Sequence, residues 1–135
     1  MILFVVVLLI IFVVIIVLRI RPSFRNYKAA LNCLMAKATF AQADEDLQSK
    51  AVSHASQVLK NMGFNDPQER YEKMSEVEKC VVLAFAFAEM GMPPPFKKES
   101  WHSVSRPFID IVKEDTAFAA ANRHLKRMYG VDIKF

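Results

Sequence analysis

The stretch MILFVVVLLIIFVVIIVL, residues 1–18, decides the architecture of this chain, because it contains no charged, amide, hydroxyl, glycine or proline residue. As a helix, about 20 such residues cross a hydrocarbon core of about 30 Å. A helix that is apolar all round is either a buried core helix or a membrane span, and we favour the span because nothing on the circumference of this run is polar. A cleaved signal peptide would need a positive segment before the run and small residues after it, and neither is present. The sequence therefore predicts a single-pass signal anchor, a transmembrane helix over residues 1–21.

The charges that follow this run predict its orientation. The cations are Arg19, Arg21, Arg25, Lys28 and Lys37, and the first acid is Asp44. Positively charged flanks stay in the cytoplasm, so we expect the N-terminus outside and residues 19–135 inside, as in a bacterial inner-membrane protein. The first four cations are also candidates for contact with headgroups at the membrane surface. Setting the topology would by itself account for them.

The composition of the remaining chain favours an all-α fold. It carries all 18 Lys and Arg and all 14 Asp and Glu, with only 3 Gly. The abundant Ala, Leu, Met, Lys and Glu are good helix formers, and the modest net charge of +4 does not indicate nucleic-acid binding. We expect the transmembrane helix to be followed by a small bundle of five or six helices. Residues 22–42 would form an amphipathic juxtamembrane stalk, and residues 43–135 the small all-α domain.

Capping residues and glycines predict where these helices begin and end. Pro22 and Ser23 predict a break between the anchor and the stalk. Helix starts are predicted at Asp66, Ser75 and Ser105, and helix stops at Gly63, Gly91 and Gly130. At Asp44 either a new helix starts or the preceding helix continues, and residues 114–116 either recap the helix from Ser105 or let it run on. The segment 75–91 is apolar almost all round, which predicts that it forms the buried centre of the bundle, with Phe85 in the core. Residues 131–135 would form a short tail against the domain.

The stretch MGMPPPFKKESW, residues 90–101, is the most site-like part of the surface. Exposed Met and aromatic side chains beside a rigid turn suit docking of a protein partner. The candidate partner-binding residues are Met92, Phe96 and Trp101. An equally good interpretation is that Phe96 and Trp101 fold back and cap the core.

Two patterns resemble metal sites but are incomplete. Glu99 and His102 form one E-x-x-H half-motif, whereas carboxylate-bridged di-iron bundles need two copies. The acidic run that begins at Asp44 lacks the glycine and the glutamate of a calcium loop. We therefore expect no metal and no cofactor.

Candidates for catalysis and for charge recognition are sparse. Cys80 could act as a nucleophile with His54 as its base. It stands, however, in the most apolar segment of the small domain, where cysteine usually packs as a small hydrophobic residue. The chain has two cysteines, so a disulfide framework is not implied. A basic cluster near the last predicted helix end suits either the helix dipole or contact with headgroups or an acidic partner. Its members are Arg123, His124, Lys126 and Arg127.

These features together predict a membrane-anchored protein that acts by binding. Its small cytoplasmic domain would bind a protein partner, as an accessory subunit, adaptor or immunity-type binder, and the partner could be a larger membrane complex. The alternative is a membrane-tethered small enzyme that uses Cys80 or a histidine. An enzyme needs a pocket where polar groups converge, whereas a binder needs an exposed apolar surface.

Overall fold

The computed structural model describes the backbone of residues 1–102 and 115–135, and the side chains of residues 1–17, 27–102 and 116–135. Within these residues the chain forms five helices and no strand, so the all-α class is confirmed. The helices are α1 (Ile2–Gln42), α2 (Glu45–Asn61), α3 (Pro67–Lys73), α4 (Glu76–Glu89) and α5 (Asp115–Tyr129). The helix predicted to start at Ser105 lies outside the described residues.

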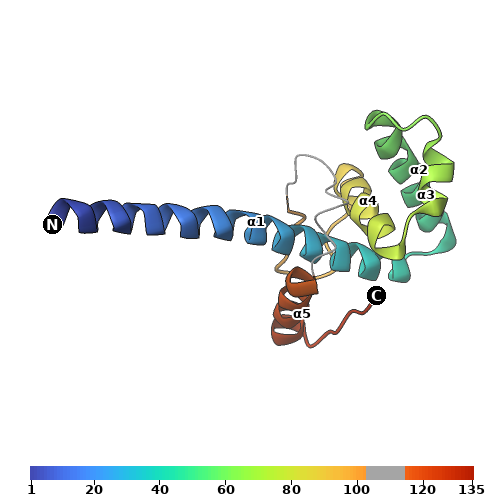
Figure 1. The fold of residues 1–135 in the computed structure, drawn as a ribbon. Helices are drawn as coiled ribbons and strands as arrows, with labels where there is room; N and C mark the ends of the chain where they lie inside the picture. The colour runs from blue at the N-terminus through green and yellow to red at the C-terminus, as the bar shows by residue number, and fades with distance from the viewer. Residues whose placement is uncertain (103–114) are drawn as a thin grey trace.

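Helix α1 is a single element of 41 residues that runs from the N-terminus through the bundle (Figure 1). The break predicted at Pro22 and Ser23 is wrong, and residues 22–42 are the second half of α1 rather than a separate stalk helix. Proline in a helix interior removes one hydrogen bond at a cost of about 3 kcal/mol. The helix-forming residues on both sides, and the packing of the second half of α1, outweigh that local preference.

The second half of α1 is the axis of the domain. Each residue from Ala29 to Ala36 is no more than 7% exposed, so this part of the helix is covered on every side. Helix α4 packs against it within one cluster of buried side chains, and α5 within another. The expectation that α4 forms the buried centre is therefore right in part: its apolar side chains are buried, but α1 is the helix that belongs to both clusters. Val82 and Phe87 of α4 are fully buried, but Phe85 is only partly buried.

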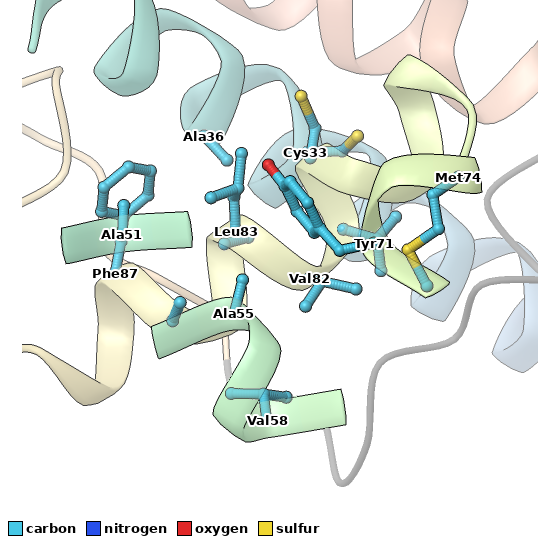
Figure 2. Packing of buried hydrophobic residues seen from close by; sticks show 14 of the residues in the cluster. Cys33, Ala36, Ala51, Ala55, Val58, Tyr71, Met74, Val82, Leu83 and Phe87 are labelled. Carbon is cyan, nitrogen blue, oxygen red and sulfur yellow. The ribbon is translucent and has the colours of Figure 1, made fainter. Parts of the chain in front are cut away.

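Two clusters of apolar side chains make up the core. The first joins α1 and α4 to α2 and α3, and Figure 2 shows Tyr71, Val82 and Phe87 among its members. The second joins α1 to α5 through small residues such as Ala121, which let the two helices approach closely. Trp101 packs against both clusters. The loop that carries this ring therefore covers the boundary between the two clusters.

Most of the predicted helix ends are confirmed. Asp44, Asp66 and Ser75 each accept a hydrogen bond from the backbone N–H three residues later, at 2.8, 3.3 and 3.2 Å. Such a side chain satisfies a donor that the helix itself leaves free. Gly63 follows α2 with a φ of +99°, a conformation that favours glycine. These ends depend on neighbouring residues alone, which is why the sequence predicts them.

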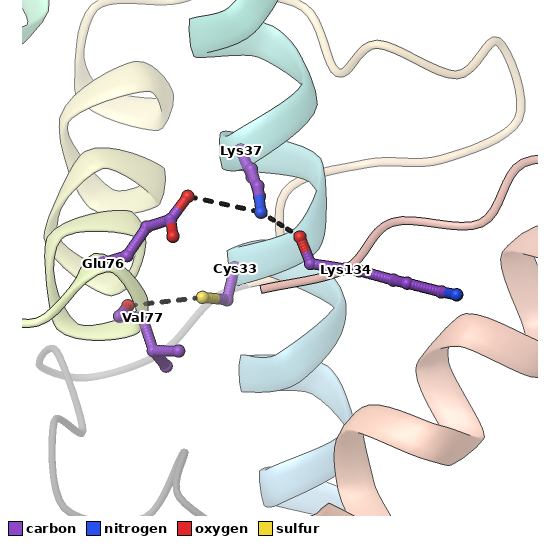
Figure 3. Close-up of polar contacts among 5 residues, drawn as sticks. All are labelled: Cys33, Lys37, Glu76, Val77 and Lys134. Carbon is purple, nitrogen blue, oxygen red and sulfur yellow. Dashed lines mark hydrogen bonds and ion pairs between the residues drawn. The ribbon is translucent and has the colours of Figure 1, made fainter.

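The C-terminal tail is tied to α1, as predicted. Lys37 lies 3.2 Å from the Glu76 carboxylate and donates a hydrogen bond to the carbonyl of Lys134 (Figure 3). Its ammonium also lies 4.3 Å from the centre of the Phe135 ring, whose edge meets Phe118 of α5. One lysine of α1 therefore connects α4 with the end of the chain.

The first half of α1 projects from the bundle (Figure 1). Every side chain from Met1 to Val17 is exposed, from 39% at Ile16 to 107% at Met1. A search of the described residues finds no helix that is both long enough and apolar enough to span a membrane.

The position of the core predicts which substitution destabilises the domain most. Leu34 of α1 is fully buried, so we expect Leu34→Ala to lower the free energy of unfolding by about 2–5 kcal/mol. Phe85→Ala should cost less, because its ring is only partly buried. Denaturant unfolding of the detergent-solubilised chain, followed by circular dichroism, measures both values. A larger loss of unfolding free energy for Phe85→Ala than for Leu34→Ala would indicate that α4, rather than α1, is the centre of the core.

Candidate functional site

Several residues singled out in the sequence meet where α1, α5 and the loop 92–102 come together. The Glu99 carboxylate, only 10% exposed, is the hub of this junction. Its Oε1 lies 2.6 Å from Nε2 of His124 and accepts a 3.0 Å hydrogen bond from the Tyr129 hydroxyl. A carboxylate is rarely buried unless it is paired in this way. Glu99 therefore fixes two side chains of α5 against the loop.

A second polar contact fastens the same loop to α1. Buried Asn32 donates to the carbonyl of His102 and accepts from the His102 N–H, both at 2.9 Å. The imidazole Nε2 of His102 is buried, and among the described residues it has no hydrogen-bond partner. Burial lowers the pKa of His102, and the charge of Lys28 lowers it further. The ring is therefore held in its neutral form.

Residues of both incomplete metal patterns make other contacts. Glu99 of the E-x-x-H half-motif is bound by residues of α5, and Asp44 caps α2. Asp46 pairs with Lys50 at 3.2 Å in the exposed first turn of the same helix. In the part of the chain with described side chains, no group of three or more His, Cys, Asp or Glu residues could hold a metal ion.

The three predicted partner-binding residues make contacts inside the domain. Trp101 stacks on Phe87 with ring centres 6.1 Å apart, and its Nε1 donates a 2.8 Å hydrogen bond to the carbonyl of Met92. Phe96 stacks on Tyr129 at 4.8 Å. Met92 packs against the first core cluster. The interpretation that Phe96 and Trp101 cap the core agrees with these contacts, and partner binding here stays a prediction.

A hollow of about 380 Å³ lies beside residues 93–95, three consecutive prolines that we call the proline turn. Pro95, Phe96, Lys97, Lys98, Met128 and Tyr129 line it. Met128 is 46% exposed, so this hollow has an apolar side chain that faces outward. Phe96 thus contributes one of its faces to the core and another to the surface. Met128 was missed in the sequence, because only the fold brings α5 beside this turn.

The predicted basic cluster lines a second hollow, of about 540 Å³, which we call the basic groove. Its lining residues are Tyr27, Ala120, Arg123, His124, Lys126 and Arg127. The Tyr27 ring of α1 meets His124 edge-on, with centres 6.4 Å apart. Burial raises the pKa of Tyr27, the Glu99 charge raises it further, and Arg127 opposes this. The phenol of Tyr27 therefore stays protonated as a hydrogen-bond donor.

The predicted membrane-surface residues lie close to Tyr27 in the sequence. Arg19, Arg21 and Arg25 lie outside the described side chains. Lys28 is half-buried next to Tyr27, and its charge acts on His102. The sequence does not indicate that Tyr27 lies beside the basic cluster, because that position depends on the packing of α1 against α5.

The fold does not bring Cys80 and His54, the predicted catalytic pair, together. Cys80, near the start of α4, is buried, and the Cys33 thiol beside it donates to the carbonyl of Val77 at 3.4 Å (Figure 3). Burial and bonding to Cys80 raise the pKa of Cys33 far above its usual range. His54 lies 2.8 Å from Glu89 at the opposite end of α4, about 13 Å along the helix from Cys80. A histidine at that distance cannot activate the Cys80 thiol.

Comparison with known proteins gives no match: no family model, no curated protein and no solved structure is significantly similar to this chain.

The neutral state of His102 predicts a dependence of stability on pH. Because its pKa is lowered in the folded chain, the unfolded chain binds a proton first as the pH falls below about 6.5. The free energy of unfolding should therefore be greatest above pH 6.5 and should decrease as the pH falls below 6.5. His102→Phe should reduce this decrease, since it removes the titrating group. Thermal unfolding of both proteins at several pH values measures the difference, and identical pH profiles would contradict the prediction.

Proposed function

We propose that this chain is a single-pass membrane protein whose small cytoplasmic helical domain binds a protein partner. The observation that carries the proposal is the exposed apolar run from Met1 to Val17. Soluble monomers rarely expose a contiguous apolar patch of more than a few hundred Å². Here the apolar side chains cover every face of the helix, so a neighbour on one side would leave the others in water. A bilayer covers them all.

The length of the run is consistent with a short span. In the sequence the apolar run reaches Leu18, which gives a helix of about 27 Å against a hydrocarbon core of about 30 Å. Local thinning of the bilayer accommodates a mismatch of this size at small cost. A helix also satisfies its own backbone hydrogen bonds, as a lipid environment requires. The cations after the run support a cytoplasmic domain in a bacterial inner membrane.

Insertion can be tested with charges in the apolar run. We expect the full chain to float with liposomes in a density gradient and to remain bound in alkaline carbonate. Leu9→Arg combined with Val13→Arg should abolish flotation, because each arginine costs about 2.5–3.5 kcal/mol at the centre of a span. Leu9→Ala with Val13→Ala is the matched control. A reporter fused after Phe135 should be active only in the cytoplasm; activity outside would reverse the proposed orientation.

The hollow beside the proline turn is the surface that best suits a protein partner. Its central side chain, Met128, is exposed and adaptable, and the neighbouring prolines hold the turn rigid. A rigid apolar surface loses little conformational entropy on docking. Trp101 packs inward against Phe87, so its ring lies beneath this surface and does not project from it.

A pair of exposed methionines allows a controlled test of partner binding. Met128 and Met62 are 46% and 39% exposed and each lies near the C-terminal end of its helix. We expect Met128→Asp to abolish co-purification of a partner that the wild-type chain retains in detergent. Met62→Asp should retain it, and both variants should keep the wild-type melting temperature. Retention by Met128→Asp would place the binding face elsewhere.

A further inference from the structure

We infer that the basic groove binds the phosphate group of an anionic phospholipid in the membrane leaflet that faces the domain. This inference rests on the proposed membrane anchor, which would bring the groove and the headgroups together. The evidence comes from the charges that line the groove, the donors on its wall, and its distance along α1 from the apolar run.

The charge of the groove suits an anion. Arg123, Lys126 and Arg127 are all exposed along one hollow, and none of the described residues that line it is acidic. The carboxylate beneath its wall, Glu99, is already engaged by His124 and Tyr129. A guanidinium presents two parallel donors that match two oxygens of a phosphate. Among the described residues no ion pair neutralises these three cations, so their charge is available to an anion in the groove.

The wall of the groove is also fixed in place. The bond to Glu99 sets the position of the His124 ring, and this ring packs on the edge of Tyr27. The protonated phenol of Tyr27 can donate a further hydrogen bond to a phosphate oxygen. Tyrosine is enriched at membrane interfaces because its ring is apolar and its tip polar. A preformed wall reduces the entropy lost when a headgroup binds.

The position of Tyr27 on α1 suits a headgroup. It stands nine residues after Leu18 in the sequence, about 14 Å along a helix. The polar region of each leaflet extends about 5–7 Å beyond the hydrocarbon core. Long arginine and lysine side chains extend toward the interface and cover much of the remaining distance. The groove therefore lies near the membrane surface, where a tethered site meets headgroups at high effective concentration.

A short-chain lipid titration tests the groove directly. The full chain in dodecyl maltoside micelles is titrated with dihexanoyl phosphatidylglycerol, and its melting temperature is recorded. We expect a saturable increase, with no increase for dihexanoyl phosphatidylcholine. Arg123→Gln combined with Arg127→Gln should weaken the apparent affinity about thirtyfold, from about 1 kcal/mol for each cation. Lys126→Gln, a single change, should weaken it about fivefold.

The matched control removes two cations far from the groove. Lys50→Gln with Lys60→Gln makes the same charge change on exposed positions of α2 and should leave the titration unchanged. Equal losses in both double variants would overturn the inference, because they would indicate unspecific charge attraction. Equal affinity for inorganic phosphate would overturn it in favour of a soluble anion. Loss of a bound partner from the arginine variant, with an unchanged lipid titration, would assign the groove to an acidic protein.

The titration does not depend on insertion, so the two proposals can fail separately. Flotation without specific binding of phosphatidylglycerol would support the proposed membrane anchor and exclude the groove as a headgroup site. Binding without flotation would support the groove and reject the anchor.

Discussion

The structure depends on one constraint: a single helix must meet two different environments along its length. Residues 1–17 are apolar and exposed on all faces of the helix, whereas the segment from Ala29 to Ala36 is buried on all faces. Both halves satisfy their own backbone hydrogen bonds, as a helix does in any solvent. Because α4 and α5 each pack mainly on α1, this helix positions the two clusters of the core relative to each other.

The polar junction around Glu99 and Asn32 explains how a loop without regular structure holds its place. Asn32 fastens the loop to α1 through the backbone of His102, and Glu99 fastens it to α5 through His124. Buried polar groups are costly unless each finds a partner, so these bonds specify one arrangement of the loop. Trp101 then occupies the space between the two clusters. The same bonds hold Tyr129, which lines the hollow beside the prolines, and His124, which lines the basic groove.

Features that depend on neighbouring residues could be predicted from the sequence, and those that depend on distant ones could not. Asp44 and Gly63 marked helix ends because capping is local. Pro22 misled for the same reason, since its local preference says nothing about the packing that maintains α1. The sequence identified the basic cluster but not Tyr27, and it paired Cys80 with His54, which the fold separates. The spacing of apolar residues does not show which helix the others will surround, so Phe85 rather than Leu34 was predicted to be the key residue of the core.

The continuity of α1 through Pro22 has a mechanical consequence. If α1 is anchored as proposed, a flexible hinge at this point would let the domain adopt many orientations below the membrane. The unbroken helix would instead transmit any tilt of its anchored half to the domain as a rotation of the same angle. On the proposed topology, bilayer thickness and neighbouring proteins, which set that tilt, would also set the height at which the domain presents its faces.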